Sequence, residues 1–266
     1  MTGNARTGWD ADAVLTAANE WSWVPPGAPH VRTDEYLVVA YPEHLLTPTG
    51  ARVFGSERAP ADLVDEVHEV ARRLGRHRLW WHVSDASRPA GLEAELRGRG
   101  AVVVERRDVL ALPLDDDLPA IGVPAGIELK RVRDLQSMRD AHVVERSAFG
   151  GVEHTEDQLR RALADLAPGL EDDATGVVVA YVDGQPAGVG GWTVVDEVCR
   201  LWGGGTHESL RGRGAYRAVL AARLRIARAA GATLGLTHGR VDTSSPILRR
   251  IGFMRYGEQR QLVLDV

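Results

Sequence analysis

One hexapeptide, Leu-Arg-Gly-Arg-Gly-Ala, occurs twice in this chain, at residues 96–101 and 210–215, and its two settings predict opposite structures. The first copy follows the helix-like segment 92–97 and enters the strand-like run 102–104, so its glycines are expected to end a helix. The second copy follows a strand-like run and opens a long amphipathic segment. Because the first N–H groups of a helix lack intrahelical partners and the helix dipole is positive there, the second copy is expected to bind an anion.

The second copy carries two residue types that suit a phosphate. Gly212 and Gly214 permit unusual backbone angles and a close approach of the ligand. Arg211 and Arg213 add charge-assisted hydrogen-bond donors. A solvated basic turn is the alternative interpretation of the hexapeptide taken alone, so the elements that flank it decide between the two.

Hydrophobic periodicity in the second half of the chain predicts a mixed α/β order. Strands are expected at 127–132, 175–182, 187–195, 198–202, 232–237 and 261–266, and helices at 134–147, 156–166 and 245–250. Asp183-Gly184 is typical of a hairpin turn between two of these strands. A further helix starts after Gly214 and is expected to end at Gly231. Its apolar face is formed by Ala215, Val219, Ala222, Ile226 and Ala229. Its basic face is formed by Arg217, Arg225 and Arg228.

The first half of the chain repeats the end of the second half. Residues 96–114 align without gaps on 248–266, so that Gly100 falls on Gly252 and three leucines fall on Leu262, Leu264 and Val266. Upstream of this match, a helix expected at 62–74 and a strand expected at 79–83 follow the same order as the helix and strand after Gly214. The repetition favours two related domains, although two amphipathic chain segments can also match by chance.

A proline-rich, acidic passage at 112–124 separates the two halves. We therefore expect an α/β fold with mixed sheets and two domains in tandem, 1–118 and 119–266. In the first domain the residues before its main helix, 55–60, contain no glycine turn like that of the second hexapeptide. This domain is accordingly expected to have lost any phosphate loop.

Composition limits the possible function classes. The net charge of −5 and pI near 6.0 argue against nonspecific nucleic-acid binding. The single cysteine, Cys199, excludes an internal disulfide framework or a site with several thiolates, and no metal is expected. The first residues precede no apolar core, and no run approaches the roughly 20 apolar residues that a membrane span needs. We expect a soluble, unprocessed, cytoplasmic protein with neither a membrane nor a nucleic-acid partner.

The order of strand, Arg-x-x-Gly-x turn, long helix, strand, short helix ending in Gly252-Phe253 and final strand resembles the coenzyme-A-binding half of the GNAT superfamily of N-acyltransferases. The resemblance covers roughly 127–266, and its specific residues are 211–216, against the family's Gln/Arg-x-x-Gly-x-Gly/Ala, and 248–253. It implies that the pyrophosphate is held by Arg211, Gly212, Arg213, Gly214, Ala215 and Tyr216. It also implies that the preceding strand pairs with the pantetheine amides through Gly204, Gly205 and Thr206.

Tyr216 stands where the family has Gly or Ala, and its ring is expected either to pack under the loop or to flank the cofactor. The resemblance implies transfer of an acetyl group from acetyl-CoA to a primary amine of a small molecule or peptide. The family often places an acidic tyrosine four residues before the Gly-Phe pair, where this chain has Leu248. Possible substitutes are His238, just after an expected strand, and Ser245, at the start of the short helix. A polar loop residue and a helix cap are the alternative interpretations of these two.

Other functions remain open from the sequence. Glu197, His207 and Glu208 border the central strand, where a base and a solvated edge residue look alike. Cys199 is a conceivable nucleophile, but cysteine in a strand is commonly a small buried apolar residue. The missing tyrosine motivates a catalytically silent acyl-CoA sensor as an alternative, and the arginine-bearing helix motivates an interaction module. We expect a monomer or a homodimer.

Overall fold

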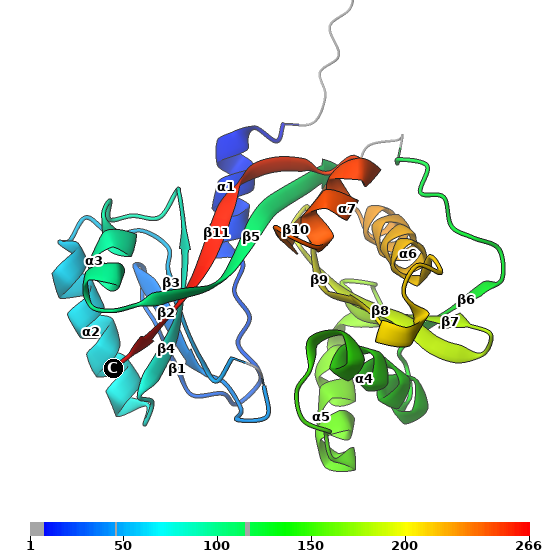
Figure 1. The fold of residues 1–266 in the computed structure, drawn as a ribbon, viewed down its shortest axis with the longest axis horizontal. Helices are drawn as coiled ribbons and strands as arrows, with labels where there is room; N and C mark the ends of the chain where they lie inside the picture. Colours follow the sequence, from blue (N-terminus) through cyan, green and yellow to red (C-terminus); the bar gives the residue numbers. More distant parts are fainter. Residues whose placement is uncertain (1–7, 46, 115–117) are drawn as a thin grey trace, which may run out of the picture. The chain divides into compact units, whose positions relative to one another are not determined.

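The computed structural model describes residues 8–45, 47–114 and 118–266, which form two compact units (Figure 1). Unit 1 contains residues 8–9, 111–114, 118–237 and 250–253, and unit 2 contains the other described residues. The chain start at 1–7 and the acidic centre of the predicted connector, 115–117, lie outside the described residues.

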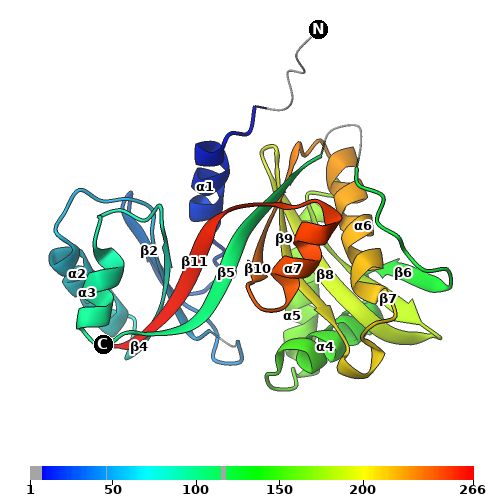
Figure 2. The ribbon, with the colours of Figure 1, turned by 45° about the horizontal axis from the view of Figure 1, so that its top comes forward.

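Unit 1 is built around strands that neighbour one another in the order β10-β9-β8-β7-β6. Its elements are β6 (Ile127–Arg131), α4 (Leu135–Phe149), α5 (Glu156–Leu166), β7 (Thr175–Val182), β8 (Gln185–Val195), β9 (Val198–Thr206), α6 (Ala215–Ala229) and the first part of β10 (Leu234–Arg240), with short 3-10 turns at Ala167–Gly169 and Glu208–Leu210. Strands β9 and β10 are parallel, and the other neighbours are antiparallel. Helices α4 and α5 lie on one face of the strands and α6 lies on the other (Figure 2).

Local sequence explains where these elements begin and turn. Helix α4 starts at a capping box in which Asp134 accepts from the backbone of Ser137, and α5 starts at a second box formed by Thr155 and Gln158. The predicted hairpin between β7 and β8 is confirmed, because Asp183 and its glycine both adopt positive φ, 52° and 75°. The mixed α/β fold expected from the sequence is therefore confirmed in unit 1.

Helix α6 differs from its predicted faces in two ways. Arg217, Arg225 and Arg228 are exposed as expected, but Ala229 is exposed as well, because it lies in the last turn. Arg223 is buried with 2% of its surface exposed. The helix thus directs one arginine toward the sheet, which periodicity alone does not predict.

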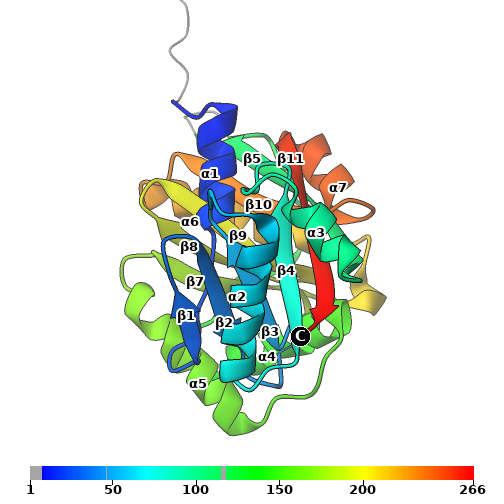
Figure 3. The ribbon, with the colours of Figure 1, turned by 90° about the vertical axis from the view of Figure 1, so that its left-hand side faces the viewer.

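Unit 2 has strands in the neighbour order β1-β2-β3-β4-β11. Its elements are α1 (Ala11–Glu20), β1 (His30–Arg32), β2 (Tyr36–Ala40), β3 (Thr49–Val53), α2 (Pro60–Arg73), β4 (Arg78–Ser84), α3 (Leu92–Gly98) and most of β5 (Val102–Pro113), α7 (Ser244–Ile251) and β11 (Met254–Asp265). Helix α2 lies across one face of the sheet (Figure 3). The elements before α2 carried no sequence pattern strong enough to predict them.

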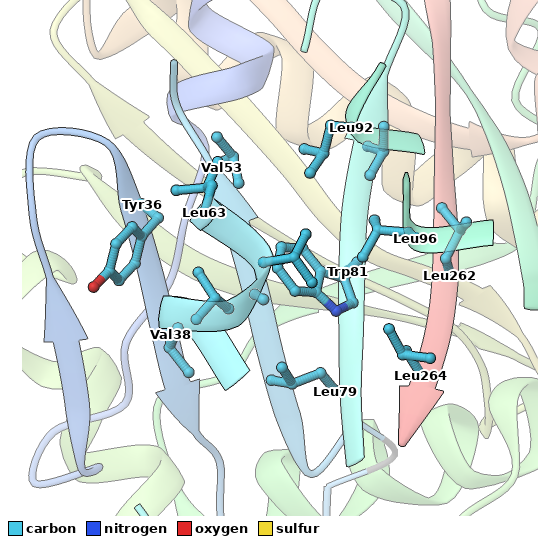
Figure 4. Close-up of a cluster of buried hydrophobic side chains, with 14 of the residues drawn as sticks. Tyr36, Val38, Val53, Leu63, Leu79, Trp81, Leu92, Leu96, Leu262 and Leu264 are labelled. Atoms are coloured by element: carbon cyan, nitrogen blue, oxygen red, sulfur yellow. The ribbon is translucent and has the colours of Figure 1, made fainter. Parts of the chain in front are cut away.

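The core of unit 2 joins residues from opposite ends of the chain (Figure 4). Leu63 of α2, Trp81 of β4 and Leu96 of α3 are fully buried beside Leu262 of β11. Strand β11 runs antiparallel to β4, with Leu262 opposite Trp81. The C-terminal strand therefore completes a core whose other buried members lie between Tyr36 and Ala101.

The internal repeat appears in the structure as matched elements. Strands β5 and β11 begin and end at positions that the ungapped alignment places opposite each other. Helices α3 and α7 begin four residues before the aligned segments, again at matching positions. Both strands are longer than the expected runs at 102–104 and 261–266. Compact units and sequence halves nevertheless differ, because β11 of the second half belongs to unit 2. The boundary between residues 118 and 119 stays a prediction.

The first hexapeptide ends a helix, as predicted. Gly100 has a φ of 95°, and the N–H of Ala101 donates to the carbonyl of Leu96 at 2.9 Å, which closes the end of α3. Across the described ranges of the chain, no helix has the length and apolar character needed to cross a membrane.

We predict that Leu262→Ala lowers the free energy of unfolding by about 2–5 kcal/mol, because it leaves a cavity beside Trp81. Met254→Ala is the matched control on the same strand, since Met254 is 51% exposed, and it should cost less than about 0.5 kcal/mol. Urea denaturation followed by circular dichroism measures both. Equal effects of the two variants would contradict a core that depends on β11.

Candidate functional site

Strand β9 loses its neighbour on one side after its first half. Residues Val198, Cys199 and Arg200 pair with β10, and the Thr237 hydroxyl then donates to the carbonyl of Leu201 at 2.9 Å. Within the described part of unit 1, no β10 residue pairs with 202–206 of β9. This stretch therefore presents a backbone edge that an extended ligand with amide groups can pair with.

The same stretch of β9 is irregular along its other edge. Trp202 lies opposite Gly191 of β8 and Gly205 lies opposite Val189, so Gly203 and Gly204 together oppose a single residue. Gly203 has a φ of 60°, in the left-handed region. This is a β-bulge, which interrupts the ladder and changes the direction of the strand.

Arg223 of α6 donates hydrogen bonds to the strands beside the bulge. Its Nη1 donates to the carbonyls of Gly191 and Trp202, at 3.0 and 3.1 Å. A Cβ on Gly190 would stand 2.6 Å from the guanidinium carbon, so glycine is required for this approach. Burial lowers the pKa of Arg223 from its usual value. One buried side chain thus satisfies a carbonyl from each of the two strands beside the break.

The second hexapeptide forms a turn at the start of α6, as predicted. Gly212 and Gly214 have φ values of 80° and 88°, and Gly214 is the N-cap residue. A Cβ on Gly214 would lie 2.6 Å from the ring of Pro124. Within the described chain, the backbone N–H groups from Gly212 to Gly214 donate to no protein acceptor. They are available to an anion at the positive end of the helix.

The two arginines of the turn differ in their contacts. Arg213 donates to the carboxylate of Asp183 at 2.7 Å, whereas Arg211 is exposed. Tyr216, the residue that departs from the family pattern, has its ring beneath β9, 3.2 Å from the position of a Cβ on Gly204. Burial raises its pKa. The ring therefore packs under strand β9, whereas the sequence placed it under the loop or beside the cofactor.

The glycines predicted to contact pantetheine are packed between two helices. A Cβ on Gly204 would meet Tyr216 and Arg223 of α6, and a Cβ on Gly205 would stand 2.8 Å from Ala148 of α4. Thr206 ends the strand opposite Gly188. Because helices pack closely on both faces of this stretch of β9, little room is left for a side chain at these two positions. The backbone edge of the strand is then the part that a ligand can reach.

The proposed catalytic histidine is a partly buried side chain of unit 2. His238 lies inside β10, which corrects the expectation that it follows the strand, because β10 continues to Arg240. Its ring lies 5.0 Å from that of Trp21, and its Nε2 has no partner among the described residues. Burial, aided by Arg52 and Arg107, lowers the pKa of His238 to about 3. The ring is therefore a weak base.

Ser245 has a structural partner. Its hydroxyl is buried and donates to the carboxylate of Asp108 at 2.5 Å. Helix α7 begins one residue earlier, and the Ser244 hydroxyl accepts from the N–H of Arg240. Ser245 is thus the second residue of α7, and its hydroxyl bonds to Asp108 instead of capping the helix.

Among the remaining candidates, Cys199 is not suited to a nucleophilic role. Cys199 is fully buried, and burial raises its pKa to about 12, so its thiol stays neutral. Glu197 lies in the turn before β9, at the end far from the bulge. His207 contacts the Ser209 hydroxyl, and Glu208 is exposed.

Sequence reasoning missed Glu145 of α4. Its Oε1 lies 3.9 Å from the position of a Cβ on Gly203, at the bulge. Burial alone raises its pKa from 4.5 to about 7. A usable pattern was present, because Glu145 follows Ala141 by four positions and precedes Ala148 by three, which places it on the sheet-facing side of the helix.

The chain matches the model of the acetyltransferase (GNAT) family over residues 135–253. This segment runs from α4 through the turn and α6 to α7, and it is a GNAT domain. The resemblance inferred from the turn is confirmed, and acyl transfer to an amine is the reaction class of the family. No curated protein matches the sequence.

Solved structures of the same fold span nearly the whole chain. A GCN5-related N-acetyltransferase from Kribbella flavida has 20% identity and a TM-score of 0.66, with 95% of this chain and 94% of that one covered. A tandem GNAT protein from the clavulanic acid biosynthesis pathway has 17% identity and a TM-score of 0.64, covering 94% and 87%. A GCN5-related N-acetyltransferase from Sphaerobacter thermophilus has 18% identity and a TM-score of 0.63, covering 87% and 81%. The likeness at these identities concerns the fold.

The described residues offer no metal centre: none of their histidine, cysteine, aspartate and glutamate side chains gather in a group of three or more suited to one.

We predict that Arg223→Met lowers the free energy of unfolding by about 2 kcal/mol, because it leaves the carbonyls of Gly191 and Trp202 without this donor. The matched control is Arg225→Met on the exposed face of the same helix, which should change stability by less than about 0.5 kcal/mol. Urea denaturation measures both, and indistinguishable midpoints would show that the bulge does not need the guanidinium.

Proposed function

We propose that the GNAT domain transfers an acetyl group from acetyl-CoA to a primary amine of a small molecule or peptide. The observation that carries the proposal is that an open strand edge and a turn with free N–H groups follow each other along the chain in unit 1. The open edge of β9, residues 202–206, leads directly into the turn at Gly212 and Gly214, whose N–H groups are free of protein acceptors within the described chain. An extended ligand with amides at one end and phosphates at the other matches this order.

Each part of the site has a separate task in this proposal. The N–H groups of the turn and the Arg211 guanidinium bind the pyrophosphate, aided by the positive end of α6. The open edge of β9 pairs with the pantetheine amides and so fixes the register of the ligand. Fixing both ends sets the position of the thioester carbon along the strand.

The bulge at Gly203 and Gly204 supplies the remaining polar groups. A break in the ladder releases backbone N–H groups, which can donate to the carbonyl oxygen as it gains negative charge. Attack by the amine nitrogen forms the C–N bond, and collapse of the adduct breaks the C–S bond and releases the thiolate. Arg223 holds the two strands in place beside this position without touching the reacting atoms.

A catalytically silent acyl-CoA sensor is the second candidate function. It is motivated by Leu248, which is 2% exposed and replaces the tyrosine that many family members use as an acid. Cys199 and His238 offer no replacement, because the thiol stays neutral and the imidazole is a weak base. The two functions share the cofactor site and differ in turnover.

Isothermal titration with acetyl-CoA and a thiol-release assay distinguish the candidates. We expect saturable binding together with thiol release that depends on one class of amine in a panel of small amines and peptides. Binding without thiol release from any amine would favour the sensor. Absence of binding at millimolar acetyl-CoA would contradict both.

We predict that Gly214→Val weakens acetyl-CoA binding by at least about 100-fold, because the new side chain collides with Pro124 and disfavours the positive φ of the turn. Gly100→Val is the matched control from the other hexapeptide. Gly100 also has a positive φ, but no atom lies within 4 Å of an added Cβ. This variant should lose stability by about 1–3 kcal/mol and keep its affinity. Titration calorimetry on folded samples decides, and equal losses of affinity would refute the assignment of the turn.

A further inference from the structure

Glu145 is a partly buried acid, and no structural partner for its carboxylate is found in the described chain. No hydrogen bond or ion pair joins its carboxylate to another residue of the described chain, although its neighbour on the helix, Arg146, pairs with Glu153 at 2.8 Å. Partial burial disfavours the ionised form of an unpaired carboxylate and raises its pKa. A carboxylate in this state is not occupied in holding the helix and is available for another role.

The position of this carboxylate is specific. Glu145 lies against the bulge of β9, with Oε1 3.9 Å from the point that a Cβ of Gly203 would occupy. One turn later on α4, Ala148 packs against Gly205. The guanidinium of Arg223 occupies the other face of the strands. The bulge is therefore bordered by an acid on the α4 side and a cation on the α6 side.

The charged and titratable groups near α4 neither pair with the Glu145 carboxylate nor cause the rise in its pKa. On α4 itself, Asp140 accepts from Tyr181, and His142 accepts from the N–H of His154. The elements packed against α4 carry Glu156, Asp157, Arg160, Arg161 and Asp165 on α5, Tyr181 on β7, and Cys199 and Arg200 on β9. None of them contributes to the shift of the Glu145 pKa, whose cause is burial.

We propose that Glu145 is the catalytic base of this domain, accepting a proton from the ammonium group of the acceptor at the bulge. The inference rests on the proposed function, because it needs the thioester to lie beside Gly203. The carboxylate also favours a positively charged acceptor, so the substrate class is a primary amine that is protonated in solution.

The proton and electron balance is simple. The ammonium N–H bond breaks, its proton passes to the Glu145 carboxylate, and the freed electron pair attacks the thioester carbon. When the C–S bond breaks, the thiolate takes the second proton lost by the nitrogen. Glu145 then releases its proton to water, and the products are an amide, a thiol and one proton.

The pH dependence has a defined sign. A base must be deprotonated in the free enzyme, so kcat/KM should rise with pH and level off above the pKa of Glu145, about 7. Because the folded-state pKa is raised above 4.5, the folded protein holds the proton longer than the unfolded chain does. The contribution of Glu145 to stability therefore falls as the pH rises from 4.5 to about 7.

The test compares Glu145→Gln with Glu153→Gln, an exposed acid in the loop after the same helix. We expect Glu145→Gln to lower kcat/KM at least about 100-fold and to abolish the rise near pH 7. Its affinity for acetyl-CoA should stay within about twofold, because Glu145 is not part of the phosphate turn. Urea denaturation should show Glu145→Gln gaining stability relative to the wild type as the pH rises through the same window. Glu153→Gln should retain the wild-type profile.

The outcomes separate this inference from the proposed function. If the wild type binds acetyl-CoA and acetylates an amine, while Glu145→Gln keeps its rate and pH profile, Glu145 is not the base and the acyltransferase proposal stands. If Glu145→Gln loses its rate only together with its affinity for acetyl-CoA, the carboxylate has a structural role and the inference is overturned. If the wild type neither binds nor transfers, the proposed function itself fails.

Discussion

The hydrogen bonds from Arg223 to the carbonyls of Gly191 and Trp202 hold together the part of unit 1 on which the site depends. A bulge leaves backbone groups without ladder partners, and such groups are costly when they are buried. A guanidinium presents several donors on a rigid plane, so a single side chain from α6 can serve both strands. The glycine opposite the break, Gly190, gives that plane the space it needs. The bulged strand β9, the turn that follows it and the N-terminus of α6 are therefore held in fixed positions relative to one another.

Much of unit 1 could be predicted because its elements follow local rules. Hydrophobic periodicity and the Asp183-Gly184 hairpin signal predicted the boundaries of α5, β7 and β8 to within a few residues. The second hexapeptide could be predicted as a turn that opens a helix because the first copy, with the same residues, enters a strand. By contrast, Arg223 and Glu145 were not found from the sequence. Charged residues in an amphipathic helix are usually assigned to the solvent-facing side, and the positions of these two on the buried side were not considered. Their roles depend on a bulge in another element, which no local pattern reveals.

The candidates chosen from the sequence for proton transfer illustrate the same limit. His238 and Ser245 were singled out for their chemistry and for their places near expected element ends. The structure surrounds the first with apolar and cationic groups and gives the second a carboxylate partner. Burial and pairing decide whether a titratable group can work near neutral pH, and both properties arise from contacts between distant segments. Glu145 has the opposite combination, since it is buried enough to hold a proton near neutral pH and lacks a partner in the described chain that would keep it ionised.

The pairing of β11 with β4 also has a consequence for how the chain is made. Leu79 and Trp81 of β4 become part of a finished core only when Leu262 and Leu264 arrive opposite them. During synthesis from the N-terminus, this edge of β4 remains without its partner while the whole GNAT domain is translated. Residues 135–253 are thus synthesised before the strand that completes the core of unit 2, although most of that core is made first.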